Sequence, residues 1–409
     1  MSLIEDFDFQ YVSDPTTYTI PQGGPRGAAV GLLDKDGKST PLTEENIDKL
    51  PKSFTKIKQR DVVFNNRIVV SPMCMYSAQD GILTDFHVAH YGGIALKGPG
   101  AVIVEATGVT PNGRISVLCS GIWSDEHIAQ HKRVSDAIKC LGVVSGIQIG
   151  HAGRKSSDAP MWLGRSNGVS KALGGWPDDV VAPSAIPFSE TTIVPRELTK
   201  DEIKEIIESF VQAAIRADKA GYDLLEIHGA HGYLLSEFFS PFANTRTDEY
   251  GGSFENRIRM MVETVKKVRE VWPETKPLWV RLSCTEWVEG GWDIEETVQL
   301  SAILKDLGVD TIDCSSGGIN NNQKIPAKSL FQVPFAEQIK REVGIATAAV
   351  GGITEPSQVE DIISTGKADF VCLARKFLND PAFTTKAARE LGVDIAWPLQ
   401  HTFGKYLRW

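Results

Sequence analysis

Three side chains that can hydrogen-bond a ligand follow closely after an apolar run at residues 222–227. They are His228, His231 and Tyr233. Glycines between them allow the chain to turn, so the three side chains can converge on one small ligand. A polar loop that caps a helix is the alternative interpretation. A metal site is not predicted, because no third cysteine, histidine or paired carboxylate lies nearby at a useful spacing.

A thiol and a phenol follow an earlier apolar run. The sequence SPMCMY at residues 71–76 puts Cys74 and Tyr76 on the same side of an extended chain. Both side chains would then point to the same place at the end of a strand. A cysteine that serves only as a small hydrophobic core residue is the alternative.

Two polar side chains interrupt apolar runs. Gln148 lies between Ile147 and Ile149, and Arg281 lies within LWVRLS. A buried amide without a partner costs about 1–3 kcal/mol, and a buried guanidinium needs an anion or another acceptor. Each residue predicts either a bound polar group or a bond to a neighbouring strand, which for Arg281 would be an ion pair with a carboxylate.

The elements that must position these residues form a regular alternation. From Phe54 onward, apolar strand-like runs alternate with amphipathic helix-like stretches. The expected strands are 67–72, 101–106, 144–149, 222–227, 277–283, 309–315, 345–350 and 368–374. The expected helices are 85–97, 125–140, 199–220, 253–272, 294–307, 334–342, 355–365 and 381–391. Eight such units predict the α/β fold of a (β/α)8 TIM barrel, whose chemistry lies at the carboxyl ends of the strands.

An open doubly wound sheet is the alternative fold, but the turn after the first strand lacks the GxGxxG motif. Late in the barrel, Gly351 and Gly352 follow the seventh expected strand, and Ala374 and Arg375 follow the eighth. Barrels commonly bind phosphate there through backbone N–H groups and a cation.

Composition limits the kinds of partner and the cellular location that we expect for this protein. The chain has 409 residues, 42% of them apolar, and a formal net charge of −9. It shows neither a basic block nor an apolar run of membrane-spanning length, so we expect no nucleic-acid or membrane partner. Six cysteines without CxxC spacing, and a start that lacks the build of a secretory signal, predict a cytoplasmic protein.

We expect two regions. Residues 1–52, rich in glycine and proline, form an N-terminal extension or arm with one short helix near residues 43–50, capped by Thr43. Residues 53–409 form the barrel domain.

The longer motifs resemble those of a known family. HGAHGYLLSEFFSP and NTRTDEYGGSFENR, together with SPMCMY, resemble the old yellow enzymes, which are FMN-dependent ene-reductases, and in particular their bacterial, thermophilic-like subclass. The resemblance runs from about Phe54 to Trp409. It implies a TIM barrel that binds FMN, takes hydride from NADPH and passes it to an α,β-unsaturated carbonyl compound in a ping-pong cycle.

The resemblance also implies roles for residues. His228 and His231 would hold the carbonyl oxygen of the enone, Tyr233 would supply a proton to its α carbon, and Tyr76 would touch it. The implied FMN-binding residues are Ser71, Pro72, Met73, Cys74, Ala106, Gln148, His228, Arg281, Gly351, Gly352, Ala374 and Arg375. In that set, Cys74 would lie beside the reactive edge of the flavin, Gln148 along its pyrimidine edge, and Arg281 near its N1 and O2 atoms.

The resemblance further implies a homodimer or higher homo-oligomer, in which Arg408 would reach the active site of a neighbouring subunit. The chain departs from the family pattern at Ala374, where many relatives have glycine, and in a longer segment at residues 156–181. Two alternatives remain. A dienoyl-CoA reductase-like FMN barrel would carry an iron–sulfur cysteine cluster, and a flavin-binding redox sensor would use Cys74 as its responsive thiol.

Overall fold

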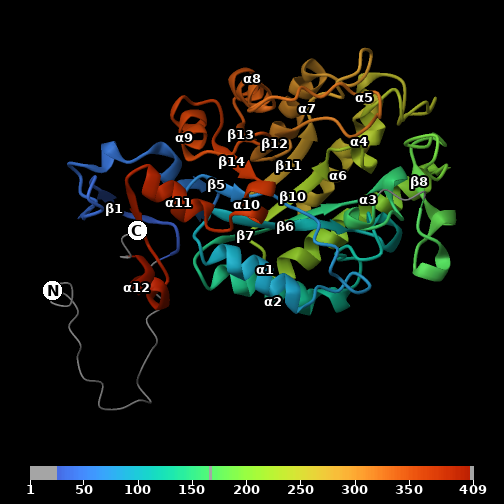
Figure 1. Ribbon diagram of the computed structural model, residues 1–409. Coiled ribbons are helices and arrows are strands. Elements are labelled where there is room, and N and C mark those ends of the chain that lie inside the picture. Colours follow the sequence, from blue (N-terminus) through green and yellow to red (C-terminus); the bar gives the residue numbers. More distant parts are fainter. Residues whose placement is uncertain (1–24, 165–167, 406–409) are drawn as a thin grey trace.

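The protein is built around one closed parallel barrel (Figure 1). The computed structural model describes residues 25–164 and 168–405. Eight strands close the barrel in the order β10-β11-β12-β13-β14-β5-β6-β7, and every neighbouring pair is parallel. The strands are β5 (Ile68–Val70), β6 (Ala101–Gly108), β7 (Val144–Gly150), β10 (Leu224–Gly229), β11 (Leu278–Ser283), β12 (Thr311–Ser315), β13 (Ala346–Ala349) and β14 (Phe370–Leu373). Each falls on an expected strand, so the predicted TIM barrel is confirmed.

The expected helices are also present around the barrel. They are α1 (Asp85–Ala95), α2 (Ile128–Lys139), α3 (Lys200–Lys219), α5 (Phe254–Arg257) with α6 (Arg259–Val271), α7 (Ile294–Asp306), α8 (Val333–Val343), α9 (Pro356–Ser364) and α11 (Phe383–Glu390). Three short helices were not expected: α4 (Leu234–Phe239), α10 (Arg375–Asn379) and α12 (Thr402–Lys405). The first two begin within a few residues of a barrel strand end, where they shape the rim that carries the predicted site.

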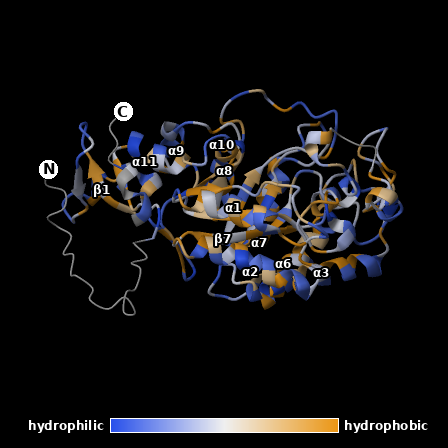
Figure 2. Cartoon of the chain, turned by 60° about the horizontal axis from the view of Figure 1, so that its bottom comes forward, coloured by the Kyte–Doolittle hydropathy of each residue, from blue (hydrophilic) through white to orange (hydrophobic). Residues whose placement is uncertain are grey.

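Side-chain patterning explains why these segments pack as they do. The barrel strands are buried on both faces, whereas α3 buries one stripe, including Ile203, Ile207 and Phe210, and exposes the opposite side. Figure 2 shows that the surrounding helices carry both hydrophobic and hydrophilic stretches. Helix α3 begins at a capping box, in which Thr199 Oγ1 accepts the Glu202 N–H and Glu202 Oε2 accepts the Thr199 N–H.

A hairpin closes the amino-terminal end of the barrel. It consists of β3 (Ile57–Gln59) and β4 (Val62–Phe64). The Phe64 ring lies 4.9 Å from the ring of Phe370 and 6.1 Å from that of Trp279, measured between centroids. These two residues stand at or near the starts of β14 and β11. A plug at that end leaves the carboxyl ends of the strands for the site.

The described part of the arm pairs with the end of the chain. Strand β1 (Ala29–Leu33) lies between β2 (Ser39–Pro41) and β15 (Val393–Ile395), all antiparallel. Figure 1 shows this small sheet to one side of the barrel. The helix expected at residues 43–50 is only a 3-10 turn at Ile47–Lys49. The prediction that Thr43 caps this helix is wrong: Asn46 precedes the turn, and its Oδ1 accepts the Thr43 N–H.

Within the described residues, no helix is long and apolar enough to cross a lipid bilayer. The same residues contain no group of three or more side chains that could hold a metal ion. All six cysteines are free thiols.

Candidate active site

The histidine pair and the tyrosine predicted from the sequence lie together at the carboxyl end of β10. The ring centroids of His228 and His231 are 5.1 Å apart, and those of His228 and Tyr233 are 5.0 Å apart, with both pairs nearly perpendicular. His228 is the penultimate residue of the strand, His231 lies in the following turn, and Tyr233 immediately precedes α4. The convergence expected from their spacing is therefore present.

The hydrogen bonds of His228 define its tautomer. Its Nδ1 accepts the Ala230 N–H at 3.2 Å, so a neutral ring carries its proton on Nε2. Burial lowers the pKa of His228 well below its usual value, and the positive charge of Arg281 lowers it further. Burial likewise lowers the pKa of His231. Both imidazoles are neutral at neutral pH.

His231 occupies a strained turn that its neighbours hold firmly. Its φ is +63°, a left-handed conformation that costs a non-glycine residue about 1–3 kcal/mol. Ser283 Oγ accepts its N–H at 2.8 Å, and Ser315 Oγ lies 2.7 Å from its Nε2. Lys155 Nζ donates to its carbonyl oxygen at 2.8 Å and to that of Gly318 at 3.0 Å. The backbone of His231 is thus held by contacts from two strand ends, and Ser315, at a third, contacts its imidazole.

Tyr233 keeps its proton at neutral pH. Burial raises the pKa of its phenol well above the usual value, and nearby acidic groups add to that effect. The ammonium of Lys155 lies 5.0 Å from the centre of the ring. The phenol is therefore a neutral hydrogen-bond donor and a potential proton source.

Four polar side chains lie side by side inside the barrel. Parallel pairing places Gln148 next to Glu226, and Arg281 next to Asp313. Gln148 Nε2 donates to Glu226 Oε1 at 2.7 Å, and Arg281 Nε lies 3.2 Å from Asp313 Oδ2. Arg281 Nη1 also donates to Ser71 Oγ at 3.2 Å. Gln148 and Arg281 therefore each bond to a side chain of a neighbouring strand, which is one of the two alternatives that the sequence left open.

The two carboxylates of this group do not carry two full charges. Burial, together with the neighbouring Asp313, raises the pKa of Glu226 to about 8. Burial also raises the pKa of Asp313, against the opposing effect of Arg281. A proton held on Glu226 leaves Arg281 paired with one carboxylate. The sequence analysis did not identify either acid as a site residue. Each lies in an apolar strand and pairs with a residue that was identified: Glu226 with Gln148, and Asp313 with Arg281.

Cys74 and Tyr76 leave the end of β5 next to the loop that follows β6. The Cys74 thiol forms a hydrogen bond with the Cys119 thiol, and this bond, together with burial, raises the pKa of Cys74 well above its usual value. Glu105 Oε2 accepts the Met75 N–H at 3.0 Å and so anchors the segment between them. Tyr76 has a φ of +49°, and burial raises the pKa of its phenol.

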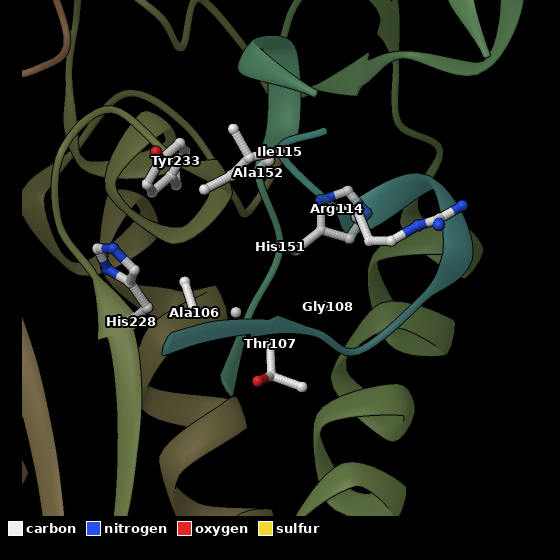
Figure 3. A pocket seen from close by; sticks show the side chains of 11 residues that line it. Ala106, Thr107, Gly108, Arg114, Ile115, His151, Ala152, His228 and Tyr233 are labelled. Carbon is white, nitrogen blue, oxygen red and sulfur yellow. The ribbon is translucent and has the colours of Figure 1, made fainter. Parts of the chain in front are cut away.

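A hollow opens beside His228 and Tyr233 (Figure 3). Small residues supply much of its wall, among them Ala106, Gly108 and Ala152. The buried His151 also lines it. Its Nδ1 accepts the Gly153 N–H at 3.1 Å, which leaves the proton of the neutral ring on Nε2, where no partner is found among the described residues. A buried donor without a partner indicates room for a polar ligand or water.

The predicted phosphate-binding residues follow two neighbouring strands. β13 pairs with β14, so Gly351 and Gly352 lie on the same rim as Ala374 and Arg375. The glycines have φ values of +103° and +67°, and a Cβ on Gly351 would lie only 2.5 Å from Gln332 Nε2. Arg375 is the exposed first residue of α10. Pro72 and Met73 lie in the segment after β5, and Arg408 lies outside the described residues.

This arrangement belongs to a known family. The sequence profile of the NADH:flavin oxidoreductase / NADH oxidase family matches residues 52–393. The chain belongs to that family. An NADPH dehydrogenase of Bacillus velezensis is 45% identical over 86% of this chain and 98% of its own length. An NADH:flavin oxidoreductase of Gibberella zeae is 44% identical over 84% of this chain and 87% of its own.

Solved structures agree with the family. Morphinone reductase matches with a TM-score of 0.68 at 27% identity, over 86% of this chain and 93% of its own. The old yellow enzyme homologue from Zymomonas mobilis matches with a TM-score of 0.69 at 25% identity, over 84% and 94%. The predicted resemblance to old yellow enzymes and the prediction of an FMN-dependent oxidoreductase are confirmed. The expected reductant agrees with the name of the NADPH dehydrogenase. The narrower subclass inferred from SPMCMY stays a prediction.

The residues of the rim suit FMN. Ala106 and Gly108 let a planar ring approach the backbone, and His151 Nε2 offers an unused donor beside them. The glycine turn and Arg375 supply N–H groups and a cation of the kind that binds phosphate at this end of a barrel.

Proposed function

We propose that this protein is an ene-reductase that uses NADPH to reduce the carbon–carbon double bond of α,β-unsaturated carbonyl compounds. Bound FMN supplies the hydride chemistry, with NADPH and the enone taking turns at one place in a ping-pong cycle. The single observation that carries the proposal is the neutral His228–His231 pair beside a protonated Tyr233 at the carboxyl end of a flavoenzyme barrel.

We assign the binding of the carbonyl oxygen to His228 and His231. Negative charge develops on this oxygen as the β carbon accepts hydride. Hydrogen-bond donors that are already aimed at the oxygen stabilise that charge without reorganisation. The Nε2 proton of His228 and the fixed position of His231 support this assignment.

We assign proton delivery to Tyr233. The α carbon must gain a proton to complete the reduction, and the Tyr233 phenol stays protonated because it is buried. Lys155, 5.0 Å from the ring centre, favours the phenolate that remains after transfer. Tyr76, whose phenol is within electrostatic range of Tyr233, would contact the substrate on another side.

The proposed FMN site comprises the residues that the sequence indicated. They are Ser71, Pro72, Met73, Cys74, Ala106, Gln148, His228, Arg281, Gly351, Gly352, Ala374 and Arg375. Arg281 would lie near the pyrimidine edge, although its pairing with Asp313 offsets part of its charge. The proposal also includes a homo-oligomer in which Arg408 reaches a neighbouring site.

Product analysis tests this function. Purified protein, NADPH and cyclohexenone should yield cyclohexanone in a 1:1 ratio to the NADPH consumed under anaerobic conditions. NADPH consumption without cyclohexanone would contradict the proposal. A redox sensor predicts negligible turnover with any enone and an oxidisable Cys74. Against it, the raised pKa of Cys74 disfavours the reactive thiolate.

A further inference from the structure

The segment at residues 156–181 carries an exposed apolar turn. In the 3-10 turn Met161–Leu163, the three side chains are 78%, 64% and 72% exposed. Consecutive large apolar side chains facing solvent are unfavourable unless something covers them in the working protein. This turn therefore indicates a binding surface.

The base of the segment is well anchored, which fixes where the turn lies. Ser157 Oγ accepts the Trp176 N–H at 2.9 Å, and the Ser157 carbonyl oxygen accepts the Val169 N–H at 2.7 Å. The Asp158 N–H donates to the Ile115 carbonyl oxygen at 2.8 Å, next to the hollow that Ile115 lines.

Trp162 reaches the site from this anchored base. Its ring stands edge-to-face against the ring of Tyr76, with centroids 5.4 Å apart and an interplanar angle of 87°. Tyr76 is 8% exposed and follows Cys74 at the end of β5. Trp162 thus packs against Tyr76, a residue proposed to contact the substrate, while most of the Trp162 residue remains open to solvent.

We propose that the turn Met161–Leu163, centred on Trp162, is an apolar subsite for the part of the substrate that lies away from its carbonyl group. The proposal rests on the function proposed above and narrows it. The preferred substrates are enones that carry an aryl or similarly bulky apolar substituent beyond the double bond. Such a group would cover Trp162 while the carbonyl oxygen remains on the histidine pair.

The size of the patch favours a small molecule over a second protein. Three side chains of this kind expose at most a few hundred Å², whereas a stable protein interface takes roughly 800 Å² from each partner. The contact with Tyr76 also places the turn directly beside the reaction site, where a substrate must already lie.

Two enones of different size test the subsite. We would measure kcat and KM for cyclohexenone and for 4-phenylbut-3-en-2-one with the wild type, Trp162→Ala and Trp162→Phe. Loss of one aromatic contact should raise the KM for the phenyl enone about 5- to 30-fold in Trp162→Ala. The KM for cyclohexenone should stay within about twofold in the same variant, because a single small ring does not extend to Trp162. Trp162→Phe keeps an aromatic ring, so its KM for the phenyl enone should be close to that of the wild type.

Leu173→Ala is the matched control. Leu173 is 74% exposed in another turn of the same segment, η8 (Lys171–Leu173), and should affect neither enone. Equal KM values for the phenyl enone in the wild type and Trp162→Ala would overturn the subsite, as would an equal rise for both enones. A Trp162→Ala variant with unchanged KM but a different mass in light scattering would assign the turn to contacts between copies. Failure of the wild type to reduce either enone would instead refute the proposed function, and the subsite with it.

Discussion

Replacing His228 by alanine tests whether this side chain acts as a neutral hydrogen-bond donor. Its Nδ1 is occupied by the Ala230 N–H, and its pKa is lowered by burial and by Arg281. The Nε2 proton therefore remains on the ring throughout the neutral range. In this state His228 donates to the carbonyl oxygen without changing its own charge.

The structure sets the size of the expected effect. Removing one pre-aimed donor to a developing oxyanion typically slows the reaction about 10²- to 10³-fold. His228→Ala also leaves the buried Ala230 N–H without its acceptor, which should lower the free energy of unfolding by about 1–3 kcal/mol. His228→Asn is the matched control, because its amide oxygen can accept from Ala230 and its amide nitrogen can donate to substrate. We expect it to stay within about tenfold of the wild type.

The assay is the rate at which cyclohexenone reoxidises the reduced protein, measured in stopped-flow from pH 6 to 9. Thermal unfolding of each variant separates lost stability from lost chemistry. A histidine that had to be cationic would make the wild-type rate fall about tenfold per pH unit above its pKa. A wild-type rate that falls in this way from pH 6.5, or a His228→Ala rate within about threefold of the wild type, would refute the neutral-donor reasoning.

Three further predictions concern neighbouring side chains. Tyr233→Phe should slow enone-driven reoxidation by about 10²- to 10⁴-fold in stopped-flow with little effect on reduction by NADPH, and equal slowing of both would contradict its role as proton donor. Ser315→Ala removes the 2.7 Å partner of His231 Nε2 and should lower kcat/KM for cyclohexenone about 2- to 13-fold, whereas an unchanged value would show that Ser315 does not position the ring. Burial raises the pKa of the Glu237 carboxyl from its usual 4.5 to about 8. Between these two pH values the carboxyl is protonated in the folded state and ionised in the unfolded state. The free energy of unfolding therefore falls as the pH rises from about 5 to 8. Glu237→Gln should reduce that fall by up to about 1.4 kcal/mol per pH unit in chemical denaturation, and an unchanged slope would contradict the buried neutral carboxyl.

The sequence was sufficient for the barrel because each strand and helix has its own periodicity. All eight expected strands are present because apolar runs such as β5 can be satisfied only by burial on both faces. The convergence of His228, His231 and Tyr233 was also predictable, since all three lie within six residues of one strand end.

Contacts between distant segments could not be predicted in the same way. The pairing of Arg281 with Asp313 depends on the register between two strands, which no local pattern records. The position of Lys155 against His231 and Tyr233 depends on a loop that follows a different strand. The pairing of β1 with β15 joins segments more than 350 residues apart, so the sequence predicted only an arm with one short helix there.

The most direct test of the central claim is anaerobic stopped-flow at the visible absorbance band of oxidised flavin. The holoenzyme would first be reduced with one equivalent of NADPH and then mixed with cyclohexenone. The proposed function predicts bleaching by NADPH, followed by rapid return of the band at a rate that increases with enone concentration. Bleaching by NADPH without any return of the band on addition of enone would contradict it.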